Sequence, residues 1–66
     1  MTLKLIRLKA TGARTGYHPA TVWRKATDPE DDFPEPVRLG KNAVAFVESE
    51  IEEWIEARIR DRDEKG

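Results

Sequence analysis

The sequence contains no cysteine. Without thiols the chain can form no disulfide, no thiolate metal site and no cysteine nucleophile, and a small domain that lacks such cross-links is typical of a reducing compartment. No stretch approaches the roughly 20 consecutive apolar residues that a membrane-spanning helix needs, and the N-terminus lacks the apolar core of a signal peptide. We therefore expect a cytoplasmic protein, from a bacterium or its phage, with no membrane partner.

Catalytic patterns are missing as well. A chain of 66 residues makes one small domain with a modest core, which leaves little room for a shielded enzyme pocket. The sequence has a single histidine, His18, and it shows no nucleophile–base pair, no glycine loop that would cradle a phosphate and no cluster of metal ligands. We expect no enzymatic activity, no cofactor and no bound metal. A binding module is the class of protein that remains.

Charge is nearly balanced overall but unevenly distributed along the chain. Twelve Lys and Arg against 13 Asp and Glu give a net charge of −1, which by itself argues against a nucleic-acid-binding protein. However, residues 1–27 carry +6 without a single acid, residues 28–36 carry −5, residues 37–47 carry +2, and residues 48–66 carry −4. Because a phosphate backbone meets a local face rather than the net charge, DNA binding stays open. The alternative is that these charges are scattered over a solvated surface.

The first half of the chain predicts a short strand and two helices. Residues 3–8 partly alternate apolar and polar side chains, so they could add a strand to a small sheet. A first helix is expected over residues 9–15, closed by Gly16 as a left-handed cap. A second helix opens at His18-Pro19, because proline suits the first helical position, and it continues over residues 20–26. The short connection between them is the spacing of a helix-turn-helix.

The second half predicts a hairpin and a longer helix. Residues 28–32 form an acidic loop, and the two prolines that follow force an extended path. Residues 37–39 and 43–47 are expected to pair around Gly40-Lys41-Asn42, with the glycine supplying an unusual φ. The last helix is expected from Glu48 to about Arg60, where an apolar stripe follows the helical period. Residues 61–66 are expected to be a frayed, charged tail.

The elements together predict an α+β fold, a small winged helix-turn-helix over residues 1–60. Five segments in this order resemble the AlpA family of small phage and prophage transcriptional regulators, which belong with the MerR-like winged-helix proteins and the phage excisionases. The segments are Ile6-Arg7-Leu8-Lys9, Thr15-Gly16-Tyr17, Thr21-Val22-Trp23-Arg24, Phe33-Pro34-Glu35-Pro36-Val37-Arg38-Leu39-Gly40, and Val44 through Trp54 with Ile55. The resemblance implies three helices with a β-hairpin wing between the second and third.

The same resemblance implies which residues would meet DNA. In that family the second helix enters the major groove, and the hairpin lies along the backbone or the minor groove. Carried over by position, the recognition surface of the second helix would consist of Tyr17, His18, Ala20, Thr21, Arg24 and Lys25. The wing would consist of Arg38, Lys41 and Asn42.

The chain departs from the family pattern at three points. Where members often have Ser-Arg-Ser-Thr, this chain has His18-Pro19-Ala20-Thr21, so a hydroxyl cap and an arginine are missing. The first helix has Ala10, Thr11 and Gly12 in place of an acid and apolar residues, and glycine inside a helix costs about 1 kcal/mol relative to alanine. The acidic loop is unusual beside DNA, and we expect it to point away from the duplex.

Individual side chains suggest different kinds of contact. Arg24 is the best candidate for reading a base, because its guanidinium can bond O6 and N7 of guanine together; a phosphate contact is the alternative. We expect phosphate contacts from the remaining basic residues of the surface, and from Tyr17 and His18 at the turn. Thr21 would touch a thymine methyl group or a phosphate. Trp23 and Trp54 are expected to pack in the core rather than to stack on bases.

The function most consistent with this reading is a sequence-specific regulator that binds double-stranded DNA of phage or prophage genes in the bacterial nucleoid. An alternative is an excisionase that bends DNA for an integrase. A less favoured alternative is a protein-interaction module that uses the acidic helix face of Glu48, Glu52, Glu53 and Glu56. Further copies of the chain, binding cooperatively or as a dimer, and an integrase are the expected protein partners.

Overall fold

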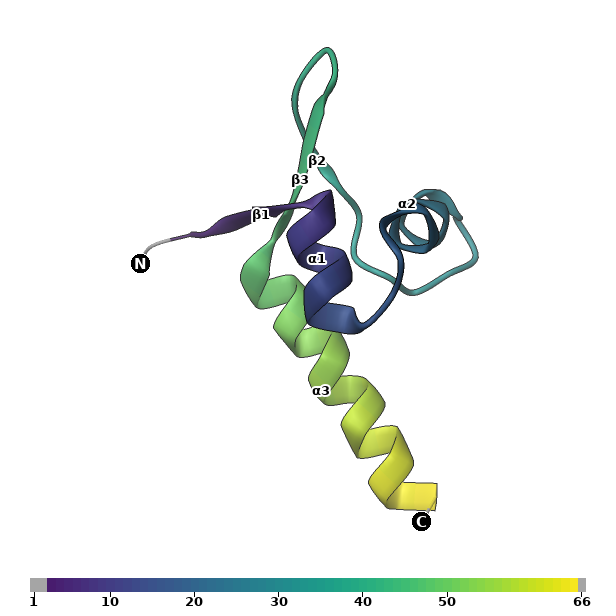
Figure 1. Cartoon of the computed structure of the whole chain (residues 1–66). Coiled ribbons are helices and arrows are strands. Elements are labelled where there is room, and N and C mark those ends of the chain that lie inside the picture. Colours follow the sequence, from purple (N-terminus) through teal and green to yellow (C-terminus); the bar gives the residue numbers. More distant parts are fainter. Residues whose placement is uncertain (1–2, 66) are drawn as a thin grey trace.

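The computed structural model describes residues 3–65 as three helices and a three-stranded antiparallel sheet (Figure 1). In chain order the elements are β1 (Leu5–Arg7), α1 (Leu8–Thr15), α2 (Pro19–Thr27), β2 (Val37–Gly40), β3 (Ala43–Val47) and α3 (Glu48–Lys65). The predicted α+β class and the order of elements are confirmed, and the fold is consistent with a winged helix-turn-helix. Within residues 3–65, no helix is both long and apolar enough to cross a membrane.

The sheet has β3 at its centre, with β1 and β2 as its edges. Ile6 of β1 lies opposite Phe46 of β3, and Arg38 of β2 lies opposite Val44. Residues that face each other across antiparallel strands share one side of the sheet. The side chains of Ile6 and Phe46 therefore project from the same side of the sheet, which is the side that faces the core. The N-terminal strand that the alternation predicted is confirmed, and it joins the start of α1 to the hairpin.

The core collects residues from distant parts of the chain. It consists of Ile6, Val22, Ala26, Phe33, Phe46 and Ile51. Phe33 comes from the loop after α2, and its ring centroid lies 5.9 Å from that of Phe46 and 5.0 Å from that of Trp54, both in edge-on arrangements. Such aromatic pairs add about 0.5–1.5 kcal/mol beyond their burial. Phe33 thus anchors the acidic loop to the body of the protein.

Two glycines make the turn between α1 and α2 possible. Gly16 has φ of 82°, and its N–H donates to the carbonyl of Gly12 at 2.8 Å, as expected of a left-handed cap. Gly12 has a different role, because a Cβ at this position would lie 2.7 Å from the carbonyl oxygen of Tyr17. The glycine that weakens α1 by propensity is therefore the residue that lets the chain entering α2 pass close to it.

The hairpin differs from the prediction at its tip. Its turn contains two residues, Lys41 and Asn42, because Gly40 pairs with Ala43 as part of the ladder. The unusual φ predicted for Gly40 is wrong, since Gly16 alone has a positive φ among residues 3–65. A register shift between Arg38 and Gly40 leaves Leu39 as a β-bulge. A bulge increases the local twist of the strand. The turn at Lys41 and Asn42 closes without a left-handed residue.

The last helix is longer than predicted, since α3 continues to Lys65 instead of ending near Arg60. Figure 1 shows its end projecting away from the other elements. Along the predicted apolar stripe Ile51 is fully buried and Ile55 is partly buried, but Ile59 is 43% exposed. The i,i+3 ion pair between Arg58 and Asp61, 3.2 Å long, is of a type that stabilises an exposed helix by about 0.2–0.5 kcal/mol. Gly66, the last residue of the predicted tail, lies outside the described residues.

Candidate nucleic-acid interface

The start of α2 is capped by a histidine. His18 has extended backbone angles, and its Nδ1 accepts a hydrogen bond from the N–H of Ala20 at 3.1 Å, with Pro19 in the first helical turn. The imidazole thus performs the capping role of the hydroxyl that we found missing from the sequence. Because Nδ1 is an acceptor, the neutral ring carries its proton on Nε2. That N–H is the group of His18 that would be able to donate to a phosphate.

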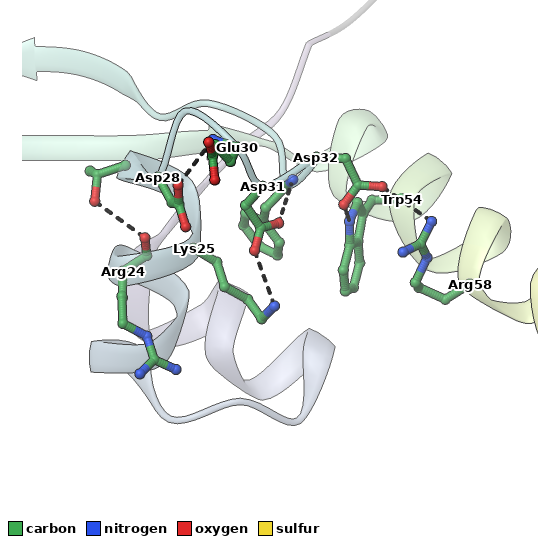
Figure 2. A network of polar contacts seen from close by, with 10 residues as sticks. Arg24, Lys25, Asp28, Glu30, Asp31, Asp32, Trp54 and Arg58 are labelled. Carbon is green, nitrogen blue, oxygen red and sulfur yellow. Dashed lines mark hydrogen bonds and ion pairs between the residues drawn. The ribbon is translucent and has the colours of Figure 1, made fainter.

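One side of α2 is open to solvent and the other packs on the core. Ala20, Arg24 and Thr27 are exposed, whereas Val22 and Ala26 are buried. Figure 2 shows the guanidinium of Arg24 pointing away from the acidic loop, and within residues 3–65 it makes no ion pair. Arg24 therefore presents an unneutralised guanidinium to solvent, as a base-reading side chain must.

Lys25, the next residue, lies in a different environment. Its Nζ is 3.2 Å from Oδ2 of Asp31, and the two side chains are only 26% and 20% exposed. The same Nζ lies 5.3 Å from the ring centroid of Tyr17, a distance at which a cation is attracted to an aromatic face. Tyr17 in turn packs against the core cluster, with its ring centroid 6.2 Å from that of Trp54. Two residues of the predicted recognition surface, Tyr17 and Lys25, thus contact other side chains of the protein and are partly buried.

Two acids of the loop after α2, Asp31 and Asp32, accept hydrogen bonds from specific groups of the protein (Figure 2). Asp31 accepts from the N–H of Phe33 at 2.9 Å and from Lys25. Asp32 accepts from Nε1 of Trp54 at 3.3 Å and from Arg58 at 3.2 Å. The loop therefore links the end of α2 to α3.

This environment lowers the pKa of one loop carboxyl. Partial burial of Asp31 opposes its ionisation, but the hydrogen bond from the N–H of Phe33 and the contact with Lys25 outweigh it, so the pKa lies below the ordinary value of 3.8. Favourable contacts to the charged form have this effect on any carboxyl group. Asp31 is therefore ionised at neutral pH and forms an ion pair with the ammonium group of Lys25.

The predicted wing residues lie on the hairpin and are exposed, namely Arg38, Lys41 and Asn42. Arg38 belongs to β2, while Lys41 and Asn42 form the turn. Neither cation has an ion-pair partner in the part of the chain that the structure describes. The hairpin projects from the body of the molecule in Figure 1, which agrees with the exposure of these three residues.

The residues predicted to meet DNA therefore differ in their exposure to solvent. His18, Ala20, Arg24 and the three hairpin residues are exposed, whereas Thr21, Tyr17 and Lys25 are partly buried. Two further cations, Arg7 of β1 and Lys9 of α1, are not among the residues predicted to meet DNA. Both are exposed, and both lack an ion pair among residues 3–65. The acid-free run of residues 1–27 was the signal that pointed to them.

The two tryptophans behave differently from each other. Trp54 packs against the core cluster as predicted. Trp23 is only partly buried and does not join the cluster, so core packing is not confirmed for it. Its position on α2 explains this, because Trp23 lies three residues after Ala20 and four before Thr27, and both of these residues are exposed. Within residues 3–65, no group of three or more His, Cys, Asp or Glu is placed to hold a metal ion.

Comparison with known proteins adds two findings to this geometry. The family model described as the prophage CP4-57 regulatory protein (AlpA) matches residues 4–59, a span that includes both helices of the turn and the whole hairpin. The chain is also 34% identical to the DNA-binding transcriptional activator AlpA of Escherichia coli (strain K12), over 88% of this chain and 89% of that protein. No solved structure matches the chain.

Proposed function

Because the chain belongs to the AlpA family of prophage regulatory proteins, we propose that it is a sequence-specific regulator that binds double-stranded DNA. The observation that carries the proposal is a set of exposed cations on α2 and the hairpin that have no ion-pair partner among residues 3–65: Arg24, Arg38 and Lys41. In the proposed complex α2 lies in the major groove, where the guanidinium of Arg24 donates two hydrogen bonds to O6 and N7 of a guanine. The hairpin lies along the phosphate backbone, where its side chains fix the register.

The electrostatic reason is the release of counterions. A cation that neutralises a phosphate releases condensed counterions, and each such contact steepens the salt dependence of binding by roughly 0.9 in log–log slope. A cation that is already paired must first give up its own carboxylate. Arg24, Arg38 and Lys41 avoid this cost, so we expect them to provide most of the affinity. His18, Ala20, Thr21 and Asn42 would add contacts from the same two elements.

The genes that such a regulator would control are those of a phage or prophage. The relative from Escherichia coli is described as a transcriptional activator, which favours transcription as the first activity to test. In the excisionase alternative the protein would bend its site, at a cost of about 1–6 kcal/mol that added contacts repay. One binding site that overlaps a promoter would support the first activity. Direct repeats beside an attachment core would support the second.

The protein-interaction alternative loses part of its surface in the structure. It relied on the acidic face of α3, but Glu48 and Glu52 already pair with Arg14 of α1. Glu48 is only 18% exposed, which leaves it poorly placed to meet a partner.

A single small module on DNA typically buries about 600–1,000 Å², so we expect DNA binding to be strengthened by a second copy of the chain.

The proposal is tested by fluorescence anisotropy with a mixed-sequence duplex at about 50 and 200 mM salt, the range over which phosphate contacts dominate the change in affinity. Wild type is compared with Arg24→Ala and with Arg60→Ala. Arg60 is also an exposed arginine, near the far end of α3, so its loss removes the same charge away from the proposed interface. We expect binding that weakens steeply with salt, that is reduced by Arg24→Ala and that is unchanged by Arg60→Ala. Absence of binding at low salt, or equal behaviour of the two variants, would contradict the proposal.

A further inference from the structure

Lys25 forms an ion pair with Asp31, whereas the neighbouring Arg24 forms none in the part of the chain that the structure describes. Both cations belong to α2, and both were assigned to DNA from the sequence. Only Lys25 faces the acidic loop, where the carboxylate of Asp31 lies 3.2 Å from its Nζ on one side and the ring of Tyr17 lies 5.3 Å away on another. Figure 2 shows the lysine pointing into this network while the guanidinium of Arg24 points out of it.

We propose that Asp31 holds Lys25 out of the DNA interface and thereby removes one phosphate contact that α2 would otherwise make. Asp31 is then a residue that determines specificity without touching DNA. A phosphate contact strengthens binding to every sequence alike, whereas base contacts distinguish sequences. By neutralising Lys25, Asp31 raises the share of the binding energy that depends on base contacts from Arg24. This inference rests on the proposed function.

Three features of the pair make it an effective competitor of DNA. First, the two side chains are about three-quarters buried, so salt screens their attraction less than it screens a pair on the open surface. Second, Asp31 is itself fixed by the N–H of Phe33 at 2.9 Å, and Phe33 is anchored in the core. Third, the pair is neutral as a unit. A phosphate that approaches Lys25 therefore meets the negative charge of Asp31 as well.

The neighbouring acids explain why the loop keeps this position. Asp32 binds Trp54 and Arg58 of α3, so the residue after Asp31 is tied to a different helix. Asp28 accepts from the N–H of Glu30 at 2.9 Å, which closes the start of the loop. Glu30 is exposed, and its carboxylate has no ion-pair partner within residues 3–65. Glu30 thus offers a matched control, since it carries the same charge in the same loop without holding Lys25.

The experiment compares salt dependences of DNA binding, measured by anisotropy with the mixed-sequence duplex. In Asp31→Asn the amide oxygen can still accept from the N–H of Phe33, so the turn is retained while the charge is lost. We expect its log–log slope to be steeper by roughly 0.9 than that of Glu30→Gln, which means a salt response between 50 and 200 mM that is about 3- to 4-fold larger. The double variant Lys25→Ala with Asp31→Asn leaves the net charge unchanged. It should have the wild-type slope.

Each other outcome has a defined meaning. If Asp31→Asn and Glu30→Gln behave alike, the loop acts only through its general charge and the inference is wrong. If the double variant is shallower than wild type by roughly 0.9, then Lys25 already contacts a phosphate and the inference is also wrong. If Asp31→Asn fails to fold, Lys25→Gln alone gives the answer, because it keeps Asp31 and its hydrogen bond from the N–H of Phe33. An unchanged slope then supports the inference, and a slope shallower by roughly 0.9 overturns it. Failure of wild type itself to bind DNA with a salt dependence would overturn the proposed function, and this inference with it.

Discussion

The two sides of α2 differ in how their positive charges are used. On the outer side, Arg24 faces solvent, as do Arg38 and Lys41 on the hairpin, and none of these three pairs with an acid in the described chain. On the inner side, Lys25 pairs with Asp31, and the acidic loop continues to Arg58 of α3. Successive residues of a helix are turned by about 100°, so two adjacent cations can belong to opposite environments. A count of charges along the sequence does not separate binding residues from structural ones.

The largest effect is expected where the inner side is anchored. Phe33→Ala removes a side chain that is 4% exposed and contacts both Phe46 and Trp54, and such truncations cost about 3–5 kcal/mol. A domain of this size is marginally stable, so we expect much of the variant to be unfolded at room temperature in urea titrations followed by circular dichroism. Leu39→Ala is the control, because Leu39 is 49% exposed and should leave the transition nearly unchanged. Equal stability of the two variants would mean that the loop is not held by the core.

A smaller effect separates a free cation from a paired one. Lys41→Ala should reduce the log–log salt slope of DNA binding by roughly 0.9 without changing the sequence preference, because it removes one phosphate contact. Arg58→Ala should leave that slope unchanged and lower the melting temperature slightly, since Arg58 binds Asp32 and Asp61 and lies 5.5 Å from the ring centroid of Trp54. Anisotropy and thermal melting of both variants check this. The comparison breaks down if the two variants exchange these effects.

The smallest effect is the part of the acid response that Asp31 contributes on the inner side. The pKa of Asp31 is lower in the folded protein than its ordinary value of 3.8. A carboxyl of this kind stabilises the fold at pH values above its unfolded pKa, and the contribution is lost as the pH falls through the folded pKa. Wild type should therefore lose more stability than Asp31→Asn between about pH 6 and pH 3. Thermal melts at both pH values, with Glu30→Gln as the control that keeps the wild-type loss, would show this.

The order of the helices was predictable because the residues that begin and end a helix act locally. Gly16 ends α1 with a left-handed cap and Pro19 begins α2 in its first turn, as expected, since both depend on the conformation of a single residue. The tip of the hairpin was not predictable in the same way. Whether Gly40 enters the turn or the ladder depends on the register against β3, and the bulge at Leu39 decides it.

Gly12 and Trp23 show the limit of the same reasoning at the level of packing. By helix propensity Gly12 weakens α1. The packing nevertheless requires a glycine there, because a Cβ would lie too close to the carbonyl oxygen of Tyr17. Trp23 is large and apolar, which predicts burial, yet the core next to Val22 is filled by Phe33, Phe46 and Ile51 from other elements. Neither fact is encoded near the residue itself.

The sequence by itself determined which elements form, in which order, and to which family the chain belongs, because caps, prolines and apolar periods act over a few residues. It also placed positive charge on α2 and on the hairpin. Only the tertiary structure decided which of those charges remain available. Phe33 draws the acidic loop onto the core, Asp31 arrives beside Lys25 as a result, and Arg24 is left free on the other side of the same helix. Ion pairs depend on distances between residues that packing brings together, and those distances are set by the whole fold.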